Sequence, residues 1–287
     1  MQQQWYQQLP VDEIRTMTPV SGGDVNQAFR VETAQETYFL LIQSQRSADF
    51  YAAEIAGLKA FEAAGITAPK VIANGCIDGD AYLLLSYLAE GVTGSQQDLG
   101  ELVAQLHRVK SPNGQFGFDL PYKGSTISFD NQWQTLWHDL FLHQRIDPLV
   151  ERIEEEGLWT ARDAQQFQQV YAIMSRTLKA HESEPSLLHG DLWAGNYMFL
   201  TDGTPALFDP SPLYGDREFD LGATKVFGGF SSDFYAAYHR AYPLKDGAFY
   251  RIQFYELYLL LVHLVKFGTV YLSAVRERMG GIIDEKG

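Results

Sequence analysis

The pattern of apolar residues changes near residue 88, and this change constrains the fold more than any other feature of the chain. Before it, five short stretches carry the β-branched and aromatic residues that are typical of strands. These stretches are residues 13–20, 27–33, 36–44, 69–75 and 81–88. One helix is predicted among them, across Phe50–Ala64, because alanine and glutamate are frequent there and Gly65 ends the run. The first 88 residues therefore predict a small antiparallel sheet with one main helix.

Helical periodicity dominates the rest of the chain. The first apolar stripe has the spacing i, i+3, i+4, i+7 and consists of Leu99, Leu102, Val103 and Leu106. Further helices are predicted at residues 131–156, 161–181, 231–242 and 251–278. Two short strands, YMFL (197–200) and PALFD (205–209), interrupt this helical part. The sequence thus predicts a bilobal α+β fold, with a β-rich lobe at residues 1–88 and a larger, mostly helical lobe at 89–287.

Charge and composition limit the partners and the location that we expect. The net charge of −14 argues against nucleic acid or an anionic membrane, because binding to these surfaces requires a basic patch. No signal peptide is expected, and the most apolar stretch contains Glu256, His263 and Lys266, which favours a buried helix over a membrane span. Cys76 is the only cysteine, so a disulfide within the chain is excluded. We expect a cytoplasmic protein whose oligomeric state the sequence does not set.

The segment HGDLWAGN, residues 189–196, has the residues that phosphoryl transfer requires. That chemistry needs a group to accept the hydroxyl proton and ligands for Mg²⁺. The spacing matches the pattern H-x-D-x-x-x-x-N of kinase catalytic loops, with Gly190 in place of arginine. Asp191 is the predicted base, Asn196 the predicted metal ligand, and Asp209 the carboxylate that would complete the metal site. His189 follows two leucines and is predicted to be a structural histidine in the core.

The same loop, together with FDPSPLYGDREFDLGATKVFGGF, resembles the fructosamine kinase family (ketosamine 3-kinases). This family has an aminoglycoside-phosphotransferase-like, protein-kinase-like fold. The segments SGGDVNQAFRV, LVAQLH and LYLLLVHLVKFG are also similar to the family, so the resemblance covers nearly the whole chain. It implies ATP-dependent phosphorylation of a ketosamine at the sugar 3-hydroxyl. The phosphorylated adduct would then break down and free the amine, which amounts to deglycation.

The resemblance also assigns roles to residues of the helical part. It implies that Asp191 is the base and that Asn196 and Asp209 hold Mg²⁺. Trp193 would be a platform for the substrate sugar, although a role as an anchor in the core fits its sequence context equally well. Asp220 resembles the aspartate at a helix start that accepts hydrogen bonds from the catalytic-loop backbone.

The β-rich lobe should hold the nucleotide. Gly22 and Gly23 would let backbone amides approach phosphate, although a glycine pair between strands is also typical of a hairpin turn. By resemblance, the backbone of Ser86, Tyr87 and Leu88 would pair with adenine.

One position departs from the family pattern. Glu54 lies four residues before Leu58 and therefore shares an inward face of the predicted helix, where a carboxylate needs a cation. In this fold the cation is a lysine of the third strand, but Leu41 occupies that position. Losing such a charge-assisted contact costs about 1.5–3 kcal/mol. Gln43 shares the strand face of Leu41 and could contact Glu54, but it brings no charge.

Several functions remain open at this point. The chain could be an active kinase in which another cation or Mg²⁺ alone suffices, or a pseudokinase that only binds a nucleotide or ketosamine. Position 41 could also be altered in this one sequence. A kinase for another small hydroxyl substrate, such as an aminoglycoside or choline, is a further alternative, for which Asp216 and Glu218 could supply the acidic residues.

Overall fold

The computed structural model describes residues 3–20, 27–124 and 126–285, and the chain forms two compact units. The first, here called the sheet unit, comprises Met1–Ser95 and Met198–Asp209. The second, here called the helical unit, comprises Gln96–Tyr197 and Pro210–Gly287. Within the described ranges, every helix is too short or too polar to cross a membrane.

The sheet unit is built on a five-stranded antiparallel sheet in the order β1-β2-β3-β5-β4. Its strands are β1 (Thr16–Pro19), β2 (Gln27–Glu32), β3 (Thr37–Gln43), β4 (Val71–Ile77) and β5 (Asp80–Ser86). All five predicted strands are therefore confirmed, each within a few residues. In the central strand β3, Leu41 pairs with Ala28 of β2 and with Leu83 of β5.

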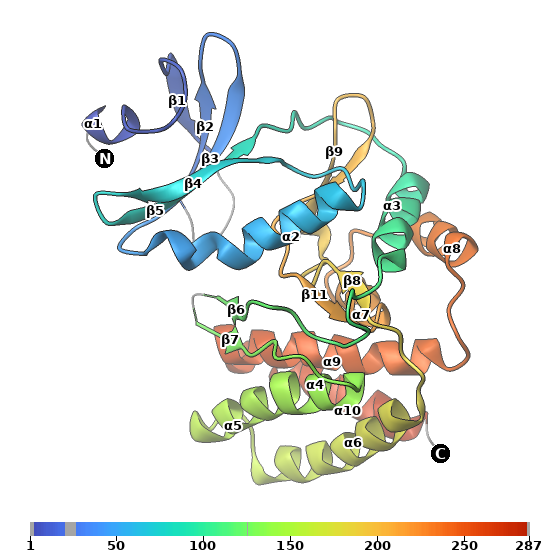
Figure 1. Cartoon of the computed structure of the whole chain (residues 1–287). Helices are drawn as coiled ribbons and strands as arrows, with labels where there is room; N and C mark the ends of the chain where they lie inside the picture. Colours follow the sequence, from blue (N-terminus) through green and yellow to red (C-terminus); the bar gives the residue numbers. More distant parts are fainter. Residues whose placement is uncertain (1–2, 21–26, 125, 286–287) are drawn as a thin grey trace. The chain divides into compact units, whose positions relative to one another are not determined.

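Each face of this sheet has its own apolar cover, because successive side chains of a strand point to opposite faces. Leu41 belongs to the face that packs on a 3-10 turn (Ala48–Tyr51) and on α2 (Ala52–Ala63), which runs along the sheet in Figure 1. Leu40 and Ile42 point to the other face, which the segment after the short helix α1 (Gln3–Tyr6) helps to cover. The helix predicted at 50–64 is confirmed, and Gly65 follows it with φ 68°.

A two-stranded hairpin of β9 (Tyr197–Phe199) and β10 (Pro205–Leu207) confirms the two predicted strands after the catalytic loop. Its turn includes Gly203, with φ 86°. The amide of Leu207 donates to the carbonyl of Thr67 at 2.9 Å, which joins β10 to the rest of the sheet unit.

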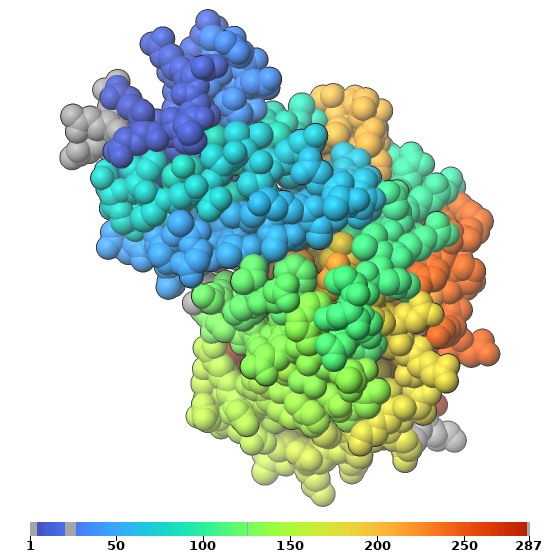
Figure 2. All heavy atoms as spheres, in the orientation of Figure 1, coloured from blue at the N-terminus to red at the C-terminus, as the bar shows by residue number. Residues whose placement is uncertain are grey.

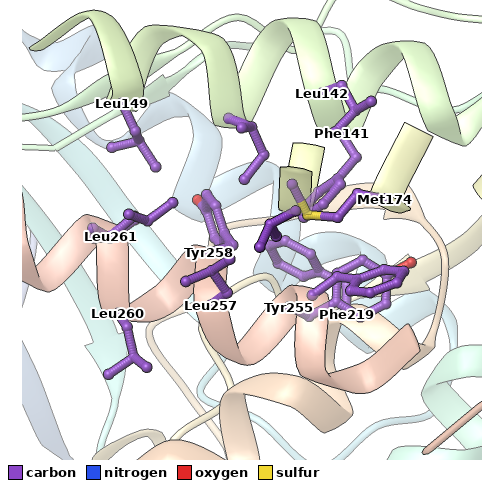
Figure 3. Packing of buried hydrophobic residues seen from close by; sticks show 14 of the residues in the cluster. Phe141, Leu142, Leu149, Met174, Phe219, Tyr255, Leu257, Tyr258, Leu260 and Leu261 are labelled. Atoms are coloured by element: carbon purple, nitrogen blue, oxygen red, sulfur yellow. The ribbon is translucent and has the colours of Figure 1, made fainter. Parts of the chain in front are cut away.

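The helical unit contains the long elements of the chain. Its helices are α3 (Gln96–Arg108), α4 (Trp137–Phe141), α5 (Asp147–Glu155), α6 (Ala161–Ala180), α7 (Glu218–Val226), α8 (Ser232–Ala241), α9 (Ala248–Phe267) and α10 (Leu272–Asp284). Two short strand pairs, β6 (Tyr122–Lys123) with β7 (Ser128–Phe129) and β8 (Ser186–Leu188) with β11 (Leu213–Gly215), accompany them. Figure 3 shows the centre of the core, where Tyr255 and Tyr258 of α9 meet Phe141 of α4, Met174 of α6 and Phe219 of α7. Packed aromatic rings therefore form the centre of the core of the helical unit.

Two helix predictions were wrong in their bounds. The helix predicted at 251–278 is broken at Gly268, whose φ of 80° and ψ of −166° suit only glycine. The helix predicted at 131–156 begins at Trp137 and contains a π-helical segment, Leu142–Ile146, between α4 and α5. The apolar pattern did not predict the helix α7, although the resemblance placed Asp220 at the start of a helix, which the structure confirms.

Candidate active site

The catalytic loop of the helical unit starts directly after β8, and a buried carboxylate holds its first two residues. The amides of His189 and Gly190 donate to Asp220 Oδ2 and Oδ1 at 2.7 and 2.9 Å. Asp220 lies in the first turn of α7 and is completely buried. Because each carboxylate oxygen accepts one backbone amide, Asp220 fixes both the position and the direction of the loop entry.

A histidine that the sequence did not identify completes this anchor. His107, at the end of α3, places Nε2 3.1 Å from Asp220 Oδ2 and Nδ1 2.8 Å from the hydroxyl of Tyr238. Both His107 and Asp220 are fully shielded from solvent. The only sequence signal was that His107 closes an apolar helical stripe, which does not reveal partners more than a hundred residues away.

Gly190 has no space for a side chain. Its φ is 83°, and a Cβ atom there would overlap the carbonyl oxygen of Ser211. The amide of Ser211 donates to the carbonyl of His189 at 2.8 Å, so the segment around Ser211 lies directly against the loop. Glycine is therefore required where other kinase loops carry arginine.

Asp191 and Asn196 are joined by side-chain contacts across the loop. Asn196 Nδ2 donates to the backbone oxygen of Asp191 at 2.8 Å and to its Oδ2 at 3.2 Å. Because the amide nitrogen makes these bonds, Oδ1 is the atom of Asn196 that can coordinate a cation. His189 is buried, and its Nδ1 accepts from the amide of Asp191 at 3.3 Å, so the contacts that it makes are those of a structural residue.

Trp193 lies on the loop with 41% of its surface exposed. Its ring covers Gly195, where a Cβ atom would overlap the indole. An indole held in this way by the backbone presents an open aromatic face, and this geometry favours a binding platform over an anchor in the core.

Asp216 and Glu218 lie just before and at the start of α7 and are both buried. Asp216 accepts from His181, Ser183 and the amide of Glu218, and the contact with His181 holds the pKa of Asp216 below its usual value against the opposing effect of burial. Glu218 forms a two-point ion pair with Arg251 at 2.7 and 2.8 Å. Both carboxylates are thus already bound by other side chains of the protein. This geometry gives no support to the prediction that Asp216 and Glu218 bind a cationic substrate.

The sheet unit shows what replaces the missing lysine. Leu41 is buried in the apolar cluster between sheet and helix, together with Tyr51 and Leu58. Burial raises the pKa of Glu54 well above its usual value, and the negative charge of Asp209 raises it further. Burial and the same two carboxylates raise the pKa of the Tyr51 hydroxyl. The carboxylates therefore act on each other, and an apolar side chain stands at the position where a cation was expected.

Nearby candidates do not supply that cation. Lys59 lies exposed on α2, and Lys70 is 3.6 Å from Glu62. Within the described ranges, no lysine or arginine forms an ion pair with Glu54. Gln43, which could have contacted it, has a buried Oε1 without a hydrogen-bond partner in the part of the chain that the structure describes.

The other predicted nucleotide contacts are Gly22, Gly23 and the Ser86–Leu88 connection. Gly22 and Gly23 lie outside the described residues. At the end of β5, the amides of Ser86 and Tyr87 donate to the carbonyls of Lys70 and Thr37 at 2.9 and 3.4 Å. These two amides are thus engaged with neighbouring backbone carbonyls, and Leu88 follows them as a half-buried residue.

Comparison with known proteins decides the family. The sequence profile of the fructosamine kinase family matches residues 1–285. The chain belongs to the fructosamine kinase family. It is 57% identical over 285 residues to a "Probable ketoamine kinase" of Staphylococcus aureus, covering 99% of both chains. It is 45% identical to a "Probable ketoamine kinase" of Lactiplantibacillus plantarum, covering 94% of this chain and 95% of the relative.

Solved structures agree with this assignment. A predicted fructosamine-3-kinase of Haemophilus somnus superimposes with a TM-score of 0.83 at 27% identity, covering 94% of this chain and 92% of that one. An aminoglycoside phosphotransferase in complex with AMP-PNP and hygromycin B gives a TM-score of 0.67 at 14% identity, over 96% of this chain and 95% of that one. The second match shows the fold alone. The fructosamine kinase family and the protein-kinase-like α+β fold, both expected from the sequence, are confirmed, and the protein is a phosphotransferase with an alcohol group as acceptor.

Proposed function

We propose that this protein uses Mg-ATP to phosphorylate the sugar 3-hydroxyl of ketosamines, the rearranged adducts of sugars on amines. The observation that carries the proposal is the Asp191–Asn196 pair, held by the buried Asp220 in a chain of the fructosamine kinase family. A protein that only bound a ligand would have no chemical need for this pair.

Asp191 is the proposed base. Its carboxylate would accept the proton of the sugar hydroxyl as the phosphoryl group is transferred. The hydrogen bond from Asn196 Nδ2 to Asp191 Oδ2 orients the carboxylate, and the amides tied to Asp220 keep the loop from shifting. Trp193 offers its exposed ring to the apolar face of the sugar.

Asn196 and Asp209 are the proposed ligands of Mg²⁺. Oxygen donors of this type suit a hard cation, and the orientation of the Asn196 amide presents Oδ1 as the ligand atom. Asn196 directly precedes β9 and Asp209 follows β10 by two residues, so the two ends of one hairpin carry both. A bound Mg²⁺ would offset the negative charge of the ATP phosphates. We assign the nucleotide itself to the sheet unit, with Gly22, Gly23 and the Ser86–Leu88 connection as contacts.

A pseudokinase is the second candidate, and one observation favours it. The charge that usually neutralises Glu54 is absent, and Leu41 contributes only apolar packing at its position. ATP binding would then rest on Mg²⁺ and backbone amides, with weaker affinity or slower turnover. We favour an active kinase because the residues of the catalytic loop are complete.

The proposed substrate is a ketosamine, either free or attached to a protein. With a net charge of −14, the chain is unsuited to nucleic acid, and the proposed place of action is the cytoplasm. An aminoglycoside or choline remains the alternative acceptor, although the buried state of Asp216 and Glu218 removes the acidic residues that would have favoured it.

Product analysis with the full chain tests this proposal. The protein is incubated with Mg-ATP and a simple fructosyl-amine, and the product is examined by mass spectrometry and by phosphorus NMR to locate the phosphate. We expect one added phosphate on the sugar 3-oxygen. Phosphorylation of choline or an aminoglycoside instead would refute the substrate class. Calorimetric binding of Mg-ATP without any turnover would establish the pseudokinase.

A further inference from the structure

A cluster of metal-ligating side chains lies in the helical unit among residues that the proposed function does not use. His138, Asp139 and His143 each offer one ligand atom, and these atoms lie within 4.8 Å of one another. They come from α4 and from the π-helical segment that follows it. We propose that this cluster, here called the His-Asp-His site, is a binding site for Zn²⁺.

The π-helical segment begins directly after α4, so its first residue lies between the two histidines in the sequence. In a regular α-helix, side chains five residues apart point about 140° away from each other. Here the amide of Asp147 donates to the carbonyl of Leu142, five residues earlier, so the turn is wider than in an α-helix. The rings of His138 and His143 lie with their centroids 6.0 Å apart. Such wide turns within helices frequently occur at functional sites.

His143 is already oriented as a metal ligand would be. Its Nδ1 lies 2.8 Å from Asp147 Oδ2, and a neutral ring that donates there keeps its lone pair on Nε2. Burial, together with a hydrogen bond from Tyr171 to Asp147, raises the pKa of the Tyr171 hydroxyl to about 12. A carboxylate behind the histidine, itself held by a further group, is the arrangement that supports histidine ligands at zinc sites.

His138 has a comparable support. Its Nε2 lies 3.0 Å from the hydroxyl of Ser175 in α6, and its Nδ1 lies 2.7 Å from Asp139 Oδ1. With Nε2 protonated towards Ser175, Nδ1 is free to bind a cation. Zn²⁺ would then bind Nδ1 and the Asp139 carboxylate together, and the neutral ring keeps its Nε2 proton in this step.

The ligand types and the exposure fit an open zinc site. Zn²⁺ prefers imidazole nitrogen and carboxylate oxygen, and three protein ligands leave a fourth position for water. His138 is 95% buried at its side chain, whereas 37% of the Asp139 side chain and 55% of the His143 side chain remain exposed. An ion can therefore reach the three side chains from solvent. In Figure 2 the light-green surface of the helical unit belongs to the stretch of chain around residues 130–155, which includes these three residues.

A second cluster with metal-ligating residues, His181, Asp216 and Glu218, is a poor competitor for the ion. Arg251 holds Glu218 with two hydrogen bonds, and Asp216 accepts from Ser183 as well as from His181. A cation entering there would face the guanidinium and would have to break these bonds. The His-Asp-His site offers a more open position.

Calorimetric titration of Zn²⁺ into the full chain tests the proposal without ATP or substrate. The protein carries no affinity tag and is first freed of metal with a chelator. We expect one Zn²⁺ per chain. Because this titration needs no turnover, failure of the proposed kinase function would not affect it.

Substitutions then locate the ion. His143→Gln and Asp139→Asn should each weaken binding by about tenfold or more, and Asp147→Asn, behind His143, by about tenfold. The matched control is His239→Gln, which removes an exposed histidine of α8 and should leave the titration unchanged. Loss of binding in Cys76→Ser or His181→Gln, equal binding in His143→Gln, or no binding at millimolar Zn²⁺ would each overturn the proposal.

Discussion

The carboxylates of the predicted catalytic loop and those of the sheet unit have opposite surroundings. The part of the sheet unit around Leu41 and Glu54, here called the wall, is the part that we expect to hold ATP. In the helical unit, Asp220 accepts two backbone amides and contacts His107, and Glu218 is paired with Arg251. In the sheet unit, Glu54 has Asp209 as its strongest charged neighbour, and both groups are acidic. Ion pairs and backbone amides thus hold the carboxylates around the loop, whereas Glu54 forms no ion pair with a lysine or arginine of the described residues.

This difference shows which parts of a kinase tolerate change. In the proposed mechanism the loop depends on direction, because a hydrogen-bonded carboxylate would have to aim at one oxygen of the substrate, and no apolar residue can do that. The wall depends partly on packing, and Leu41 supplies packing between β3 and α2 while giving up the charge. We therefore expect changes at the loop to reduce catalysis strongly and changes at the wall to tune nucleotide affinity.

Of the variants at Asp220, Leu41 and Asp163, Asp220→Asn is expected to have the largest effect. Both oxygens of Asp220 accept backbone amides, so an asparagine would turn its own NH₂ group towards one of those donors. Losing a charge-assisted bond of about 1.5–3 kcal/mol should lower kcat by about 100-fold. Steady-state kinetics give the value, and Asp233→Asn, an exposed aspartate of α8, is the control. Full activity in Asp220→Asn would break the contrast between loop and wall.

A smaller and opposite effect is expected for Leu41→Lys. The new ammonium could pair with Glu54 and contact the ATP phosphates, and we expect about a tenfold gain in ATP affinity or in kcat/KM. Leu41→Met, which keeps an apolar side chain of similar volume, should change neither. If the lysine instead lowers both affinity and turnover, the wall is adapted to leucine and the account of the missing cation is wrong.

The smallest effect on catalysis is expected for Asp163→Asn, in the helical unit away from the loop. Arg276 and Thr160 hold the pKa of Asp163 below its usual range. A lowered folded-state pKa gives stability that is present above the unfolded value of about 3.9 and is lost as the pH falls through the folded value. Weakening the capping box with Thr160 should cost about 1 kcal/mol at pH 7, which is about 2–4 °C in Tm.

Thermal unfolding at several pH values measures this prediction. The difference in Tm between the variant and the unaltered chain should shrink as the pH falls below about 4, and kcat at neutral pH should stay the same. A difference in Tm that grows in acid would contradict the sign of the pKa shift. A marked loss of kcat would show that the loop is sensitive to distant changes in its own unit.

Local patterns in the sequence predicted the five strands of the sheet, the β9–β10 hairpin and most helices, because these follow from alternation and from apolar stripes. The short strands β6, β7, β8 and β11 were not predicted. The local patterns also failed where a single backbone feature overrides a continuous pattern. The stripe of α9 continues past Gly268, yet the conformation of Gly268 breaks the helix. Gly222 lies within α7, and glycine is an unfavourable residue inside a helix, so the local pattern did not indicate one. The structure needs glycine there because Tyr255 packs against it and leaves no space for a side chain.

The residues of the candidate site that lie within the motif HGDLWAGN could be predicted from the sequence. HGDLWAGN gave Asp191 and Asn196 because their spacing in one loop is itself the signal. His107 could not be found in the same way, because its partners Asp220 and Tyr238 are 113 and 131 residues away in the sequence. The loss of the cation at Leu41 was visible only through comparison with a family pattern.

The most direct test of the account is a single-turnover measurement of phosphoryl transfer from Mg-ATP to a fructosyl-amine, comparing the unaltered chain with Asp191→Asn. The variant keeps the shape of the side chain but cannot accept the proton. We predict a loss in rate of about 100-fold or more, with ATP affinity and Tm unchanged. An unchanged rate in Asp191→Asn would contradict the account, since the loop would then not carry the base.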